Sequence, residues 1–282
     1  MLSIYNLTSV VQGKTVLSHI KTQFVLGEHY CLLGRNGSGK SSLAMSIMGN
    51  PAYECSFNDA IGETIDNQTP GIWMIDEESF FDEVTKRSLI DHGINDLNRI
   101  NISELGVDMR AKLGIFVAFQ TIPQIPGVKL FEFLRIIYNA RWGTSETFLS
   151  FKKIIEPLCQ ELMIERDFLR RDVNVGFSGG ERRKIEILQL QILKPRYIFL
   201  DEVDSGLDVD AFKSIAQILS AYRSSTNTFV IITHYFDILE YIPVDHVYLM
   251  DGGMIISKGD MSMASTVKEH GFETLLSTTI KQ

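Results

Sequence analysis

The sequence has few cysteines and no long hydrophobic segment. Its three cysteines, Cys31, Cys55 and Cys159, lie far apart and form no CxxC pair. They therefore indicate neither a zinc site nor a ligand set for a metal cluster. No apolar stretch approaches the roughly 20 residues that a helix needs to cross a bilayer, so we expect no direct membrane insertion.

Positive charge is also scarce. Lysine and arginine total 27 against 35 aspartates and glutamates, which gives a formal net charge of −8. Proteins that bind nucleic acid usually carry a basic surface, and the short cluster Arg182, Arg183 and Lys184 is interpreted as the solvated first turns of a helix. We expect no nucleic-acid partner. The N-terminal residues show no secretory or transit pattern, which predicts a cytoplasmic protein.

What the sequence does contain is an alternation of short apolar strands with helices. Such alternation predicts an α/β fold built on a mainly parallel sheet. A hairpin is indicated around 251–253, whereas the acidic stretch 55–106 has no clear pattern. Strands are predicted at 2–7, 22–26, 29–33, 197–200 and 229–233, and helices at 41–48, 180–193, 209–224 and over most of 130–164.

A glycine-rich loop follows the predicted strand 29–33 and leads into the helix at 41–48. It fits GxxxxGK[ST], the phosphate-binding loop, in which backbone N–H groups and the helix N-terminus hold phosphates. Lys40 is expected to reach the β and γ phosphates, and the Ser41 hydroxyl to bind Mg²⁺. The predicted nucleotide-binding residues are Gly34, Arg35, Asn36, Gly37, Ser38, Gly39, Lys40, Ser41 and Ser42.

Such an enzyme needs an aspartate at the end of a buried strand to hold Mg²⁺. Two strand ends fit, Ile75-Asp76-Glu77 and Leu200-Asp201-Glu202. The second lies between a helix and a βα unit, as a central strand should. We therefore assign Asp201 to Mg²⁺ and Glu202 to the attacking water, which it can deprotonate or align. Asp76 and Glu77 are expected on a solvated face.

Four further motifs resemble those of the ABC ATPase family and stand in its order. They are AFQ at 118–120, the signature FSGGE at 177–181, the D-loop DSGLD at 204–208 and the switch Thr233-His234. The resemblance implies a P-loop NTPase of ABC type, with a RecA-like core, a small antiparallel β subdomain and a helical subdomain at about 122–193. It further implies one domain over 1–282, with an insertion within 55–106.

Roles for individual residues follow from the same resemblance. His234 and Gln120 would assist Glu202 and Lys40 in catalysis, and Gln120 would also contact Mg²⁺. The signature of one chain would face the γ-phosphate of a second copy, so that ATP joins a homodimer. The signature residues are Phe177, Ser178, Gly179, Gly180 and Glu181, and the D-loop residues are Ser205, Gly206, Leu207 and Asp208.

Within this family the chain most resembles the SufC group, the ATPases of SUF iron–sulfur cluster assembly. The stretches that carry this are IFVAFQ at 115–120 with IPGV at 125–128, VNVGFSGGE at 173–181, DSGLDVDA at 204–211 and THY at 233–235. The implied cofactors are ATP and Mg²⁺, and the implied partners are scaffold subunits resembling SufB and SufD. Two departures are Val203, where serine is common, and the absence of an adenine-stacking aromatic near Val11 and Gln12.

Other functions remain as alternatives. The main alternative to SUF-type assembly is that the chain is the motor subunit of an ABC transporter, docked to a separate membrane chain. A DNA-linked ABC clamp would carry coiled-coil inserts, but the sequence has no sustained heptads. A further alternative is a nucleotide-gated assembly module with negligible turnover. A phosphate-release assay would separate it from a SUF-type ATPase, because it would release little phosphate.

Overall fold

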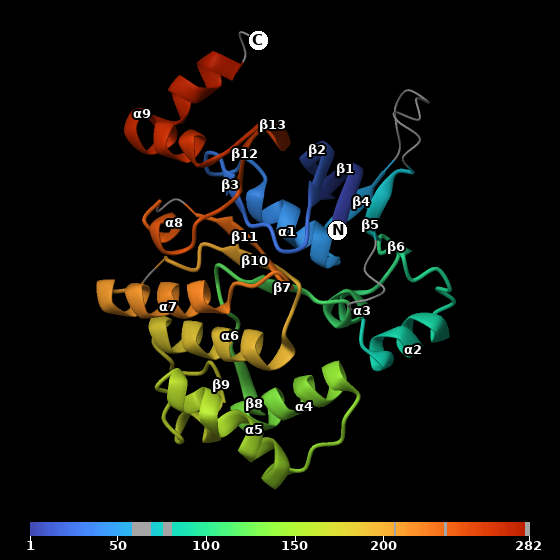
Figure 1. Ribbon diagram of the computed structural model, residues 1–282, viewed down its shortest axis with the longest axis vertical. Helices are drawn as coiled ribbons and strands as arrows, with labels where there is room; N and C mark the ends of the chain where they lie inside the picture. Colours follow the sequence, from blue (N-terminus) through green and yellow to red (C-terminus); the bar gives the residue numbers. More distant parts are fainter. Residues whose placement is uncertain (58–68, 76–80, 206, 234–235, 280–282) are drawn as a thin grey trace.

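The computed structural model describes residues 1–57, 69–75, 81–205, 207–233 and 236–279 (Figure 1). A parallel sheet forms the centre, with strands in the order β12-β3-β11-β10-β7, and β13 pairs antiparallel with β12 at one edge. The strands are β3 (Tyr30–Leu33), β7 (Ile115–Ala118), β10 (Tyr197–Asp201), β11 (Thr228–Ile232), β12 (His246–Asp251) and β13 (Met254–Gly259).

Both faces of this sheet are covered, which is why its strands are continuously apolar. Side chains alternate between faces along a strand. In β10, Tyr197 and Phe199 belong to one hydrophobic core, and Ile198 and Leu200 to the other. The first core includes α1 (Lys40–Met48); the second includes α6 (Gly179–Leu193) and α7 (Val209–Tyr222), which lie together beneath the sheet in Figure 1.

A second, antiparallel sheet packs on the α1 side and has the order β2-β1-β5-β6, with β4 also paired to β1. Its strands are β1 (Leu2–Val11), β2 (Lys14–Phe24), β4 (Glu54–Ser56), β5 (Gly71–Ile75) and β6 (Arg99–Asn101). The strand that precedes Asp76 is β5, and β5 belongs to this antiparallel sheet and not to the parallel one. Asp76 and Glu77 themselves lie outside the described residues.

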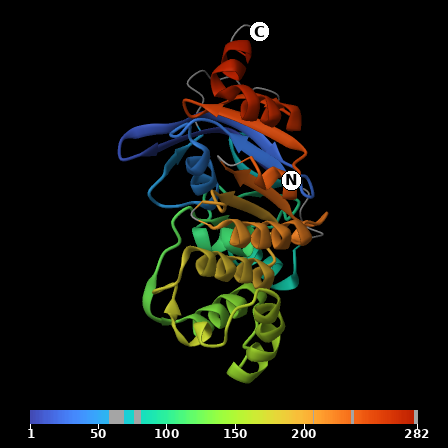
Figure 2. The ribbon, with the colours of Figure 1, turned by 90° about the vertical axis from the view of Figure 1, so that its left-hand side faces the viewer.

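A mainly helical part occupies the end of the molecule opposite α9 (Met261–Thr279), as both ribbon views show (Figures 1 and 2). Thr147 caps the N-terminus of α5 by accepting from the Ser150 N–H. The elements here are β8 (Ile125–Lys129), α4 (Leu130–Trp142), α5 (Phe148–Glu161), the 3-10 turn η3 (Phe168–Arg170) and β9 (Asp172–Val173).

The predicted fold class, an α/β ABC ATPase fold with antiparallel and helical parts, is confirmed. The proposed limits of the helical subdomain and of the insertion stay predictions. Between residues 54 and 112 the structure places β4, β5 and β6, with α2 (Glu83–Asp91) and α3 (Val107–Lys112). The short helix α8 (Ile238–Tyr241) follows β11. Among the described residues no helix has the length and apolar character needed to cross a bilayer.

Candidate nucleotide site

The loop between β3 and α1 has the backbone that its glycines predict. Gly34 has a φ of 155°, and a Cβ there would lie 2.3 Å from the Met250 carbonyl oxygen, so only glycine fits. Gly39 is the N-cap of α1 with a φ of 105°, in the region that glycine adopts at little cost. The loop therefore brings the N-terminus of α1 to the carboxyl end of the parallel sheet, where ligands bind in such folds.

Lys40 lies at the mouth of this loop and is 5% exposed. Its ammonium Nζ donates to the carbonyl oxygens of Gly34 at 2.8 Å and Arg35 at 3.0 Å. Burial lowers the pKa of Lys40, and the nearby carboxylates of Glu202 and Asp201 act in the opposite direction. A cation held beside backbone amides at a helix N-terminus is suited to bind phosphate.

Ser41 and Asp201 meet across the site although they are far apart in sequence. The Ser41 hydroxyl donates to Asp201 Oδ1 at 2.9 Å, and Asp201 is 1% exposed at the end of β10. Burial raises the pKa of Asp201, while the hydrogen bond from Ser41 lowers it. The structure thus brings together the hydroxyl and the carboxylate that were predicted to share Mg²⁺.

These oxygen donors fit Mg²⁺. That ion is commonly held by one or two carboxylates together with substrate phosphates and water, rather than by an all-protein cage. In the described part of the chain no group of three or more His, Cys, Asp and Glu side chains could hold a metal. This site offers the Ser41 hydroxyl and the Asp201 carboxylate as oxygen donors. Phosphate oxygens would complete the set.

Glu202 follows directly after Asp201 and adopts a left-handed backbone with a φ of 49°, which is strained for a residue with a side chain. Its Oε2 accepts from Gln120 Nε2 at 2.6 Å. Gln120 comes two residues after β7, the neighbour of β10. Because β7 and β10 run parallel, Gln120 and the carboxylate of Glu202 lie side by side at the carboxyl end of the sheet.

A cavity of about 400 Å³ lies over these groups. Val16 from β2 also lines it and was not predicted; no aromatic side chain of the described residues does so. The lining residues are Val16, Asn36, Gly37, Ser38, Gly39, Lys40, Ser41, Ser42, Gln120 and Glu202.

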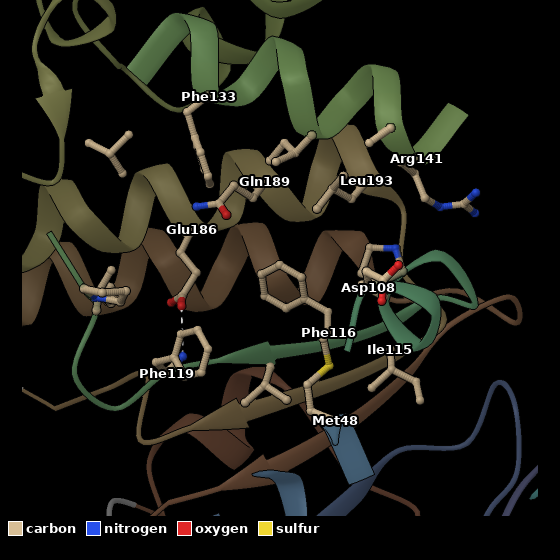
Figure 3. A pocket seen from close by; sticks show the side chains of 18 of the residues that line it. Met48, Asp108, Ile115, Phe116, Phe119, Phe133, Arg141, Glu186, Gln189 and Leu193 are labelled. Carbon is tan, nitrogen blue, oxygen red and sulfur yellow. Dashed lines mark hydrogen bonds between the residues drawn. The ribbon is translucent and has the colours of Figure 1, made fainter. Parts of the chain in front are cut away.

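A second cavity of about 380 Å³ lies between the sheet and the helical part. Phe116 from β7 and Phe133 from α4 extend toward it from opposite walls (Figure 3). Its lining is mainly apolar and includes no residue of the phosphate loop. The first cavity, not this one, is lined by groups suited to bind phosphate.

The signature lies at the N-terminus of α6, away from the first cavity. Ser178 caps the helix: its Oγ accepts from the Glu181 N–H at 3.3 Å, and Glu181 Oε2 accepts from the Ser178 N–H at 2.7 Å. Phe177 is buried, whereas Ser178 and Gly179 are exposed. A Cβ at Gly180 would meet only Ala211 at 3.6 Å, an ordinary contact. Packing within the described part of the chain does not require glycine there.

Two D-loop residues have defined partners. Ser205 Oγ donates to the Glu202 carbonyl at 2.9 Å, and Asp208 caps α7 by accepting from the Ala211 N–H at 2.8 Å. Leu207 is half-buried. Gly206 and His234, predicted for the D-loop and the switch, lie outside the described residues.

One prediction from the sequence is wrong. Arg183 is not solvated: it is 4% exposed and paired with Glu186, itself 5% exposed. The i, i+3 spacing of the two charges on a helix was the available signal. Charge spacing alone does not show whether such a pair faces water or the interior.

Fold and site together define a phosphate-loop nucleotide-binding protein of the α/β class. The family model described as "ABC transporter" matches residues 17–205. The chain belongs to this family and is an ATP-binding ABC ATPase.

Similar proteins cover nearly the whole chain. "Probable ATP-dependent transporter ycf16" of Pyropia yezoensis is 36% identical over 99% of this chain and 98% of its own length. "Iron-sulfur cluster assembly protein SufC" of Plasmodium falciparum is 34% identical over 98% of this chain and 71% of its own length. Among solved structures, the dimeric ATP-binding cassette MJ0796 bound to ADP and Pi has a TM-score of 0.65 at 17% identity, covering 93% of this chain and 99% of that one.

Proposed function

We propose that the chain hydrolyses ATP with Mg²⁺ at the cavity over the phosphate loop. Lys40 binds the β and γ phosphates together with the loop amides, while Ser41, Asp201 and Gln120 hold Mg²⁺. The ion neutralises phosphate charge when bound. Glu202 accepts a proton from the attacking water or aligns it. The hydrogen bond from Gln120 to Glu202 supports a shared role at the γ-phosphate.

Two copies complete each site in this proposal. The observation that carries it is the separation of the signature from its own phosphate loop: the described residues lining that cavity include none from 177–181. Exposed N–H groups at a helix N-terminus bind anions, and Gly180 leaves room for close approach. The ligand would be the γ-phosphate held by a second copy, with the D-loops adjoining the same interface.

The substitution Glu202→Gln tests hydrolysis directly. Without a basic carboxylate, turnover should fall by roughly 100-fold or more, while ATP binding persists. With ATP and Mg²⁺ the variant should elute as a dimer on a sizing column. Near-normal phosphate release would remove Glu202 from the mechanism.

We further propose that this ATPase drives a conformational change in a SUF-type iron–sulfur assembly scaffold. Support comes from the stretches at 115–128, 173–181, 204–211 and 233–235, and from the similarity to the Plasmodium falciparum protein over 98% of this chain. The described cysteines agree with a cluster held elsewhere, because Cys31 and Cys159 are buried and Cys55 is exposed alone. The expected partners are two scaffold subunits resembling SufB and SufD, in the cytoplasm.

Co-purification from native cells decides between this proposal and a transporter motor. A scaffold-associated ATPase should be recovered in the soluble fraction with SufB-like and SufD-like chains, and its turnover should rise when they are added. Recovery with membranes and a membrane-spanning chain would favour the transporter function, which the name of the Pyropia yezoensis relative suggests for that protein.

A further inference from the structure

A buried ion pair on α6 lies outside the lining of the nucleotide cavity. Arg183 Nη1 donates to Glu186 Oε2 at 2.6 Å, and both side chains are almost fully buried. A buried ion pair is weak evidence for stability, because an apolar pair of similar volume is often as stable or more so. The other contacts of this pair indicate what else it does.

Both polar backbone groups of Phe119 are held by this pair. Glu186 Oε1 accepts from the Phe119 N–H at 3.0 Å, shown as the dashed line in Figure 3. Arg183 Nη1 donates to the Phe119 carbonyl at 2.8 Å. Phe119 immediately precedes Gln120, so α6 fixes the backbone from which the Gln120 side chain extends.

The same guanidinium also reaches the backbone of the candidate catalytic carboxylate. Arg183 Nη2 donates to the Glu202 carbonyl at 3.0 Å, and that oxygen also accepts from the N–H and the Oγ of Ser205. Glu202 has a strained left-handed backbone, which the surrounding structure must hold in place. Arg183 is therefore one of the groups that maintain it.

Ser178 begins the helix that carries these two charges. The helix is hydrogen-bonded throughout, so its N-terminal turns move together. A displacement of Ser178 toward a phosphate would move Arg183, and with it the backbones of Phe119 and Glu202. The contacts thus connect Ser178, which would face the nucleotide of a second copy, to Gln120 and Glu202 in the chain's own site.

We propose that Arg183 and Glu186 are positioning residues that set Gln120 against Glu202 and transmit movement of Ser178 to both. This rests on the proposed function, in which Ser178 contacts the ATP of a second copy. Binding of that ATP then changes hydrolysis in the chain's own site. The two sites of the dimer would be coupled through this pair.

The first test is Glu186→Gln, which keeps an acceptor for Phe119 but removes the charge facing Arg183. Displacing Gln120 or Glu202 by about an ångström should lower kcat roughly tenfold or more. The Kd for ATP should stay within about twofold, because the phosphate loop is untouched. The control is Lys184→Gln, which neutralises one charge on the same helix and should leave kcat unchanged.

A second variant separates positioning from folding. Arg183→Met with Glu186→Leu removes two buried charges but leaves the Phe119 backbone groups without these partners, so the variant should stay folded with a moderately lowered melting temperature. Its kcat should nevertheless fall, because the Phe119 and Glu202 backbones lose their partners. Full activity in this well-folded double variant would overturn the proposal.

A readout that needs no turnover separates failure of this proposal from failure of the proposed function. A non-hydrolysable ATP analogue should slow amide hydrogen exchange in a peptide covering 115–121 of the wild type. Glu186→Gln should bind the analogue but lose that response. An equal response in the variant, or no response in the analogue-bound wild type, would sink the coupling even if ATP hydrolysis is established.

Discussion

Lys40 shows how one side chain can be prepared for its ligand by the residues around it. Its Nζ already lies within hydrogen-bond distance of two loop carbonyls, at 2.8 Å and 3.0 Å. These two bonds restrict the Lys40 side chain before any ligand is present, so the proposed phosphate contact should cost little further side-chain entropy.

Replacing Lys40 by Ala should therefore abolish productive ATP binding. Removing a close, desolvated charge partner costs about 2–5 kcal/mol, which is roughly 30-fold or more in Kd. Isothermal titration with ATP and a phosphate-release assay would measure both losses. Lys14→Ala, at an exposed position on β2, is the matched control. Near-normal turnover in Lys40→Ala would refute the assignment of the site.

A second residue predicts how stability changes with pH. His29 is 3% exposed, and its Nδ1 accepts from the Phe229 N–H at 3.1 Å. Burial, aided by the charge of Arg223, lowers the pKa of His29 from 6.5 to about 4. The unfolded chain then binds more protons between these values. The stabilising contribution of neutral His29 is complete above 6.5 and is lost as the pH falls toward 4.

Denaturant unfolding at about pH 7 and about pH 5 would measure this loss. His29→Gln retains an acceptor for the Phe229 N–H but does not titrate. The free energy of unfolding should therefore fall more steeply in the wild type than in this variant. Equal pH dependence in the two proteins would show that His29 titrates normally in the folded state.

At the scale of elements, the two sheets explain which acidic strand end can serve the phosphates. β10 pairs in parallel with β11, which pairs in parallel with β3, so Asp201 ends next to the loop that follows β3. β5 instead pairs antiparallel with β1 and β6. Its carboxyl end belongs to the other sheet.

Asp76→Asn should therefore leave turnover within about twofold of wild type, whereas Asp201→Asn should reduce it by roughly 100-fold. Steady-state kinetics at saturating Mg²⁺ would compare the two. A collapse of activity in Asp76→Asn would show that the wrong strand end has been assigned to the metal. An unchanged Mg²⁺ dependence of Asp201→Asn would also show that Asp201 does not hold the metal.

A buried arginine at the element scale links α3 to the C-terminal end of α1. Arg110 of α3 is buried and donates to the carbonyls of Ser46 and Ile47 at 3.0 Å and 2.9 Å, near the C-terminal end of α1. A cation is favourable at a helix C-terminus. The segment after β6 thereby supports the helix that begins at the phosphate loop.

For the whole molecule, the proposal of shared sites makes a prediction about mixtures. A Lys40→Ala chain keeps its signature, and a Ser178→Arg chain keeps its phosphate loop. Each variant alone should be inactive, but a mixed dimer contains one complete site. Phosphate release should therefore reappear on mixing.

The control for this experiment mixes Lys40→Ala with Lys40→Ala/Ser178→Arg, which cannot form a complete site in any pairing. Activity that stays absent in the first mixture, although heterodimers are detected, would contradict completion of the site by a second copy. Substantial activity of Ser178→Arg alone would do the same.

The residues of the phosphate loop could be proposed from the sequence because this motif is continuous in the chain. Its glycines, lysine and serine must follow one another between a strand and a helix, and the spacing is visible without any contact. The strand end at Asp201 was predictable for a similar reason, since an apolar run that ends in polar residues indicates a strand of a parallel sheet. Gln120 was predicted only through the resemblance of residues 118–120 to a family motif. The hydrogen bonds of Asp201 to Ser41 and of Gln120 to Glu202 were not predictable in this way.

The sequence by itself determined the α/β class through its apolar periodicity and the phosphate loop through its local spacing. The resemblance of four further motifs indicated the family. Only the tertiary structure decided that β5 belongs to the antiparallel sheet and that Val16 lines the nucleotide cavity. It alone also showed that Arg183 is buried and bonded to the backbones of Phe119 and Glu202. Those facts depend on which distant segments pack together. Long-range packing depends on the summed burial of many side chains, and no single stretch of sequence contains that sum.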